Sequence, residues 1–207
     1  ETSTFIIDSI CTSDSTEISN SFNENFKSVF TVDDGTIPPF GKYRMLPSVE
    51  DVIITEPGVL NLLLNLNEKK SPGPDDIPNA FLKRYAEWCA KFLVIIFTLS
   101  LSTGVLPEDW KVSKIKPLFK QGDKQSVTNY RPIALTSTCC KLLEHIIHKH
   151  ISTFLTTHSI LSSAQHGFRR GFSTVTQLAK TVHDFAVTIN DRKQTDVIFI
   201  DFAKAFD

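Results

Sequence analysis

Apolar residues recur every three or four positions in five stretches of the chain, the spacing that places them on one side of a helix. The stretch 140–155 is the clearest, because its apolar residues fall on one face while its histidines and Lys149 mostly fall elsewhere. Ser173 is a suitable N-cap for a further helix, which the polar pair at 190–191 ends. The predicted helices cover residues 22–30, 48–70, 76–103, 140–155 and 173–190.

The longest predicted helix opens at Asp76 or Pro78 and ends before Gly104, a glycine suited to a helix C-terminus. Before it, the sequence SPGPD at 71–75 predicts a rigid turn. Residues 36–47 contain three prolines and a glycine and predict a linker.

Alternating polar and apolar residues predict a β-strand at 113–119, and residues 130–135 are a second strand candidate. Lysines alternate with apolar residues in the first strand, and a tight Gln-Gly-Asp turn at 121–123 follows it. We expect a basic β-hairpin with a long loop, in which Pro132 limits its strand to an edge or an early position. A third strand is predicted at 196–202, where an apolar run leads to Asp201.

The distribution of charge along the chain, more than its sum of −1, changes this picture. Residues 1–60 hold ten acids and three bases, a net charge of −7, whereas residues 110–150 hold eight bases and two acids, a net charge of +6. The second segment therefore suggests a basic face for phosphates. A solvated, lysine-rich surface is the alternative explanation.

Length and composition indicate a globular protein with one sizeable core, or one and a half domains. The four cysteines lack the spacing of a zinc site, so we expect reduced thiols in an intracellular chain, nuclear or cytoplasmic and not secreted. The most apolar stretch, 92–101, is shorter than the roughly 18 residues of a bilayer span, and no membrane association is expected. The chain lacks an initiator Met and a leader, and we expect both ends to be cut.

Five sequence blocks occur in a fixed order, and together they are highly specific. The most informative is FIDFAKAFD at 199–207. The others are SPGPDDIPNAFLK (71–83), LFKQGD (118–123), NYRPIALTS (129–137) and QHGFRRGFSTVTQL (165–178). Together they resemble the reverse transcriptase of LINE-type, non-LTR retrotransposons, strongly over 71–207 and loosely before that, through SFNENFKSVFT (21–31).

The resemblance implies an RNA-directed DNA polymerase that uses an RNA template, a DNA primer and dNTPs. The implied fold is α+β, the helix-rich fingers region of a right-hand polymerase with the small basic hairpin and the first palm strand. Residues 1–47 would form a polar extension and linker, and residues 48–207 truncated fingers and the start of the palm. The alternative is a non-catalytic nucleic-acid-binding remnant of a decayed element, and the oligomeric state is left open.

By resemblance, Asp201 is the catalytic residue and first metal-binding aspartate, and the backbone carbonyl of Phe202 is a neighbouring Mg²⁺ ligand. Nucleotidyl transfer by two metal ions needs carboxylates on a rigid element. A carboxylate that merely ends a strand is the alternative for Asp201. Asp207 fits the pattern too, but its distance from Asp201 favours a structural role. The aspartate pair that completes such a site is absent, so we expect the chain alone to be inactive.

The resemblance also assigns nucleotide-binding residues. Lys120 and Arg131 would bind the triphosphate, which needs a point charge and a forked donor. Phe206 would be the aromatic wall that excludes a ribose 2′-hydroxyl, with a palm-core residue as the alternative.

Template contacts are expected from two groups of cations, Lys114 with Lys116 and Arg169 with Arg170. Arg170 and Phe172 depart from the family pattern, which has a proline at the first of these positions, so the geometry of that loop is open. The turn at 71–75 carries no acid–base chemistry, and we expect it to start a helix and to approach template backbone through Gly73.

Overall fold

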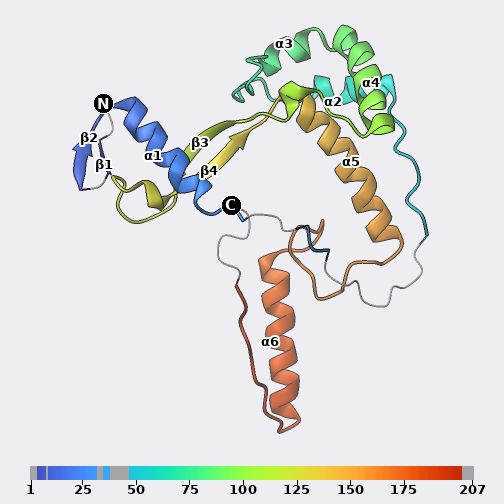
Figure 1. The fold of residues 1–207 in the computed structure, drawn as a ribbon. Coiled ribbons are helices and arrows are strands. Elements are labelled where there is room, and N and C mark those ends of the chain that lie inside the picture. Colours follow the sequence, from blue (N-terminus) through green and yellow to red (C-terminus); the bar gives the residue numbers. More distant parts are fainter. Residues whose placement is uncertain (1–3, 8, 32–34, 38–46, 202–207) are drawn as a thin grey trace. The chain divides into compact units, whose positions relative to one another are not determined.

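A computed structural model describes residues 4–7, 9–31, 35–37 and 47–201 (Figure 1). Its mixture of helices and two small sheets agrees with the predicted α+β class. The elements are β1 (Phe5–Ile7), β2 (Ile10–Thr12), α1 (Ser15–Lys27), α2 (Glu56–Leu64), α3 (Asn79–Arg84), α4 (Ala86–Thr103), η1 (Glu108–Trp110), β3 (Lys114–Phe119), η2 (Val127–Asn129), β4 (Tyr130–Leu135), α5 (Thr138–Thr157) and α6 (Thr174–Asn190).

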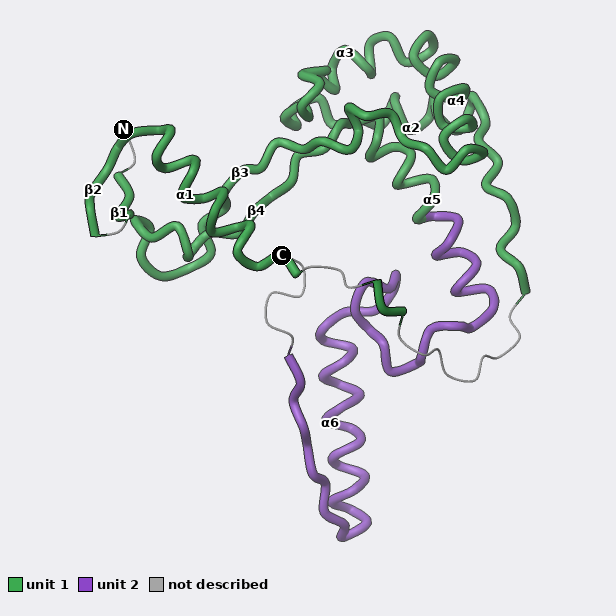
Figure 2. The backbone as a smooth tube through the Cα atoms, in the orientation of Figure 1, with its two compact units in different colours: residues 1–148, 204–207 green, residues 149–203 purple. Residues whose placement is uncertain are grey.

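The described residues form two compact units, one up to residue 148 and one from residue 149, with the boundary inside α5 (Figure 2). The first unit contains a helical core built by α2, α3, α4 and the first turns of α5. Its buried residues are Val59, Leu63, Leu82, Ala86, Cys89, Ala90, Leu93, Phe97, Cys139, Leu142 and Leu143. Burial of these side chains is what holds the four helices together.

The prediction of one long helix from residue 76 or 78 to 103 is wrong, because the chain bends at Tyr85 (φ −107°, ψ 29°) between α3 and α4. Leu82 before the bend and Ala86 after it are both buried in the core. Packing therefore overrides a continuous helical pattern. The end at Gly104 is confirmed, since this residue has the left-handed conformation of a C-cap (φ 69°).

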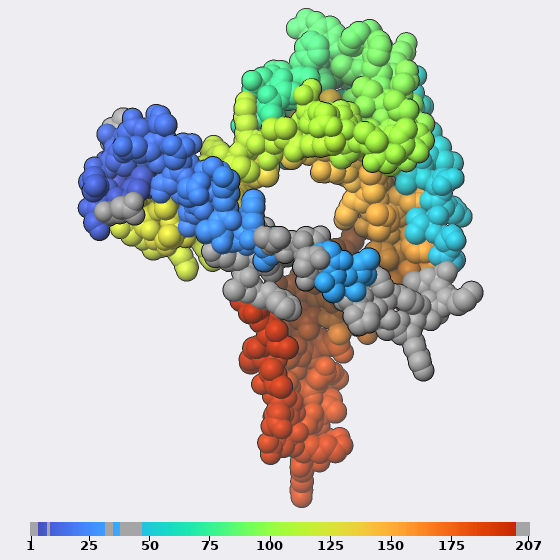
Figure 3. All heavy atoms as spheres, viewed as in Figure 1, coloured from blue at the N-terminus to red at the C-terminus, as the bar shows by residue number. Residues whose placement is uncertain are grey.

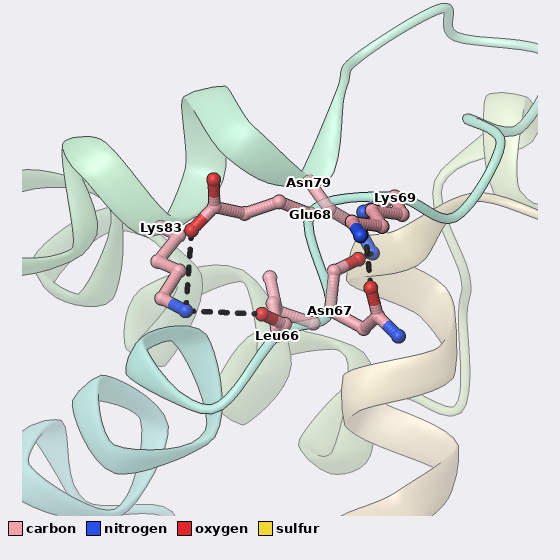
Figure 4. Close-up of polar contacts among 6 residues, drawn as sticks. All are labelled: Leu66, Asn67, Glu68, Lys69, Asn79 and Lys83. Atoms are coloured by element: carbon pink, nitrogen blue, oxygen red, sulfur yellow. Dashed lines mark hydrogen bonds and ion pairs between the residues drawn. The ribbon is translucent and has the colours of Figure 1, made fainter.

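The helix predicted at 48–70 is limited to α2. Thr55 caps its first turn by accepting a hydrogen bond from the Gly58 amide, and the Asn65 side chain donates to the Asn61 carbonyl at its end. Figure 4 shows the turn that follows, where Asn79 and Lys83 of α3 point toward residues 66–69. Asn79 donates to the Asn67 carbonyl (2.9 Å), and Lys83 pairs with Glu68 (3.2 Å), so this turn is fastened to α3.

Helix α4 is long and apolar enough to cross a bilayer, judged on length and composition alone, and a core helix passes the same test. Six of its residues are buried in the protein, including Phe97, which is fully buried. The structure therefore gives α4 a role in the core.

The amino-terminal segment is more ordered than the sequence predicts. Residues 5–7 and 10–12 form the antiparallel pair β1–β2, and α1 begins at Ser15, where Asp14 accepts hydrogen bonds from the amides of Thr16 and Glu17. The predicted helix at 22–30 therefore starts too late and extends too far, since Phe30 lies beyond α1 and is exposed. Each strand has only three residues, too few for the alternation of a strand to be recognised.

Both carboxyl-terminal helices are confirmed, and the last strand is not. α5 begins two residues before its predicted start, and Ser173 caps α6 in a reciprocal pair with Thr176. Residues 196–201 form no strand, and Val197 to Ile200 are exposed. A strand needs a hydrogen-bonded neighbour, and the described part of the chain supplies none to this segment. Residue 202 lies outside the described residues.

Candidate phosphate-binding surface

The hairpin β3–β4 is confirmed, and its register collects cations on one face. Lys116 lies opposite Ile133, and Leu118 lies opposite Arg131. Because directly opposed residues share a face and side chains alternate, Lys114, Lys116 and Arg131 point to the same side. Lys120 follows β3 in the same alternation, and its amide donates to the Asn129 carbonyl (2.9 Å). Along the hairpin, Lys116, Arg131 and Lys120 thus follow one another on this face at intervals of about 7 Å, the spacing of every second residue in a strand. We call these three residues the basic face.

The cations on this side of the hairpin differ in availability. Lys114 forms an ion pair with Asp76 at 2.5 Å. The three side chains of the basic face are exposed and make no ion pair with any described residue. An anion would therefore meet free cations along the basic face and a neutralised lysine at the base of the hairpin. The pairing of Lys114 with Asp76 was not predicted, since a carboxylate 38 residues away in sequence gives no signal of this pair.

The opposite face of the hairpin is closed by aromatic side chains near its tip. Phe119 and Tyr130 oppose each other with ring centroids 5.5 Å apart. Tyr130 also packs edge-on against Phe22 of α1 (5.0 Å), and Phe22 is buried. Near its tip, the hairpin therefore has aromatic rings packed on one side and exposed cations on the other.

The base of the hairpin is fastened to the helical core by the turn at 71–75. Gly73 is buried, and a Cβ atom at this position would lie 2.6 Å from the Thr136 carbonyl oxygen. The Thr138 hydroxyl donates to the buried Asn79 side chain (2.7 Å). The expectation that Gly73 approaches template backbone is wrong, because its open side is filled by residues 136–137 of the same chain.

The loop before α6 uses its two arginines differently. Arg169 donates to the carbonyls of Ser162 (2.8 Å) and Gln165 (3.2 Å) and lies over the Phe172 ring (4.4 Å). Arg170 is exposed, and no described residue bonds its side chain. His166 contacts the other side of this turn through Thr176 and Phe172. Arg169 therefore braces the turn, and Arg170 is the arginine presented to solvent.

Asp201 is exposed at the end of an irregular segment. Phe202, Phe206 and Asp207 lie outside the described residues. No group of three His, Cys, Asp or Glu side chains in the described part of the chain is arranged to hold a metal ion. Asp201 alone does not make a Mg²⁺ centre, so the described residues do not by themselves fit the two-metal site that the resemblance implies.

The buried cysteines of α4 and α5 are packing residues. Burial raises the pKa of Cys139 to about 12, with the nearby Asp75 charge adding to it. Burial likewise raises the pKa of Cys140 to about 11, with a further contribution from Glu144. Thiols held neutral in this way are poor nucleophiles and poor metal ligands.

Comparison with known proteins gives a family for this arrangement. Residues 120–207 match the model described as reverse transcriptase (RNA-dependent DNA polymerase). The chain is 33% identical over 150 residues to the probable RNA-directed DNA polymerase from transposon BS of Drosophila melanogaster, a match covering 72% of the chain and 17% of that protein. It is 31% identical over 156 residues to the RNA-directed DNA polymerase from mobile element jockey of the same species, covering 74% of the chain and 17% of that protein.

The chain spans about a sixth of the length of these relatives. The matched residues include most of the hairpin, the loop before α6 and Asp201, three of the regions singled out by the motifs. The chain therefore belongs to the reverse transcriptases of LINE-type, non-LTR retrotransposons.

Proposed function

We propose that this chain forms the fingers region and the start of the palm of an RNA-directed DNA polymerase, within residues 48–207. In this proposal, the basic face binds phosphates of the incoming nucleotide and of the RNA template, and Arg170 adds a template contact. Asp201 and the Phe202 carbonyl contribute to a Mg²⁺ site whose other ligands are additional to the described residues. Phe206 forms the wall against a ribose 2′-hydroxyl.

The observation that carries the proposal is the division of the hairpin into two sides. Lys116, Lys120 and Arg131 share a face without any described acid to neutralise them, while the aromatic rings near the tip of the other face pack against α1. Free, exposed cations at regular intervals suit a charged polymer or a triphosphate better than a protein core. A purely structural hairpin has no need of this arrangement.

Arg131→Ala in a complete polymerase is expected to lower kcat/KM for dNTP by about 10- to 100-fold, because a hydrogen bond to a charged group contributes roughly 1.5–3 kcal/mol. Steady-state primer extension at varied dNTP concentration measures this. Arg84→Ala is the matched control, since Arg84 is exposed on α3, away from the hairpin. Equal kinetics for Arg131→Ala and the control would assign Arg131 a structural role.

Lys116→Ala in this chain is expected to reduce the slope of log K against log salt for single-stranded RNA by about 0.7, the release expected for one phosphate contact. Lys114→Ala should change the slope less, since Asp76 already neutralises Lys114. Fluorescence anisotropy with a labelled RNA at several salt concentrations provides the measurement. Lys91→Ala on α4 is the control, and a slope unchanged by Lys116→Ala would remove Lys116 from the template contacts.

A further inference from the structure

An aromatic cluster joins the amino-terminal segment to the tip of the hairpin, although about 100 residues separate them in sequence. Phe5 and Phe22 are both 7% exposed. Phe22 lies between Phe5 (5.2 Å) and Tyr130 (5.0 Å), measured between ring centroids. The Phe5 ring also reaches Tyr130 (5.7 Å), so three rings from β1, α1 and β4 contact one another. Figure 3 shows the blue amino-terminal residues against the yellow loop of the hairpin.

The amino-terminal segment also forms hydrogen bonds with backbone carbonyls of the loop at 120–129. The Ile6 amide of β1 donates to the Gln125 carbonyl (2.9 Å). The Asn25 side chain of α1 donates to the Val127 carbonyl (3.4 Å). Both elements of the amino-terminal segment therefore hold the loop, in addition to the ring contacts.

The loop needs such support because a two-stranded hairpin is marginally stable by itself. Its internal bonds include the Tyr130 hydroxyl to the Lys124 carbonyl (2.8 Å) and the Asn129 side chain to the Asp123 carbonyl (2.9 Å). Lys120 opens this loop and Arg131 follows Tyr130, so the residues that would bind phosphate border the braced segment. Their position depends on whether the loop keeps one conformation.

We infer that residues 4–7 and 9–27 act as a brace for the tip of the hairpin and that Phe22 is a positioning residue for nucleotide binding. The inference rests on the proposed phosphate role of Lys120 and Arg131. Phe22 would not itself contact a phosphate. It fixes the aromatic side of the hairpin, so that the cations on the other side are pre-arranged and binding loses less conformational entropy.

The first test measures the loop in this chain. Phe22→Ala should speed amide hydrogen exchange of Lys120 and of Ile6 by about a hundredfold, since truncating a buried ring opens local structure. Amides of α4 should keep their protection, because no residue of the brace belongs to the helical core. Phe30→Ala is the matched control, with a ring that is 71% exposed in the same region. Loop amides unchanged by Phe22→Ala would overturn the brace.

The second test measures nucleotide use by the complete polymerase. Phe22→Ala should raise KM for dNTP by about tenfold with kcat nearly unchanged, since loss of pre-arrangement weakens ground-state and transition-state binding alike. Phe22→Leu keeps an apolar side chain and should give a smaller change of the same kind, even if the alanine variant does not fold. An unaltered KM in a folded Phe22→Leu variant with faster loop exchange would overturn the positioning role.

Arg131→Ala, measured beside these variants, separates the two claims. If Arg131→Ala raises KM and neither Phe22 variant does, the brace is wrong and the proposed function stands. If Arg131→Ala leaves nucleotide kinetics unchanged, the proposed function fails first, and the positioning role fails with it.

Discussion

Gly73→Ala is expected to be the most destabilising glycine-to-alanine change among the glycines that the structure describes, lowering the free energy of unfolding by about 1–3 kcal/mol or more. The new Cβ atom would lie 2.6 Å from the Thr136 carbonyl oxygen and 2.7 Å from the Ser137 nitrogen. Because both neighbours are backbone atoms, rotation of a side chain cannot relieve the clash. The turn at 71–75 would have to separate from the junction between β4 and α5.

Urea unfolding followed by circular dichroism measures this effect, and Gly167→Ala is the matched control. No heavy atom lies within 4 Å of a Cβ atom built at Gly167, so its midpoint should stay near that of the wild type. A Gly73→Ala protein with normal stability and weakened RNA binding would instead restore Gly73 as a template contact.

The elements that the sequence predicts correctly are those fixed by neighbours a few residues apart. The apolar spacing of α5, the Ser173 cap of α6 and the alternation in β3 are all local signals. The basic face follows from the same alternation once the register is known. Lys120 and Arg131, both predicted to bind the triphosphate, therefore lie on one face of the hairpin. The register that places them there could not be predicted from the sequence.

The features that could not be predicted depend on contacts between distant segments. Nothing near Phe22 indicates that Tyr130 will cover it, and nothing near Lys114 indicates Asp76. The bend at Tyr85 follows from burial of side chains on both sides of it in a core shared with other helices. The strand predicted at 196–202 is not formed over the described residues 196–201, because an apolar run makes a strand only beside a hydrogen-bonded partner.

Asp201→Asn is expected to reduce DNA synthesis by a complete polymerase about a thousandfold or more, since metal-ion catalysis supplies several kcal/mol of transition-state stabilisation. The substitution keeps the shape of the side chain and removes the negative charge that a divalent cation requires. Asp201 is exposed, so the unfolding midpoint and the affinity for template RNA should both remain close to those of the wild type. Loss of activity in a stable, RNA-binding protein would then report on chemistry alone.

Asp196→Asn supplies the control, because it makes the same change in the same irregular, exposed segment. Asp196 accepts a hydrogen bond from Gln194 (2.8 Å), an exposed contact that contributes little to stability. Primer extension on an RNA template should therefore proceed normally with Asp196→Asn and nearly stop with Asp201→Asn. An equal loss in both variants would assign the effect to the segment as a whole. Comparable synthesis by Asp201→Asn and the wild type would mean that Asp201 only ends an apolar run, and the metal ligands would have to be sought elsewhere in the polymerase.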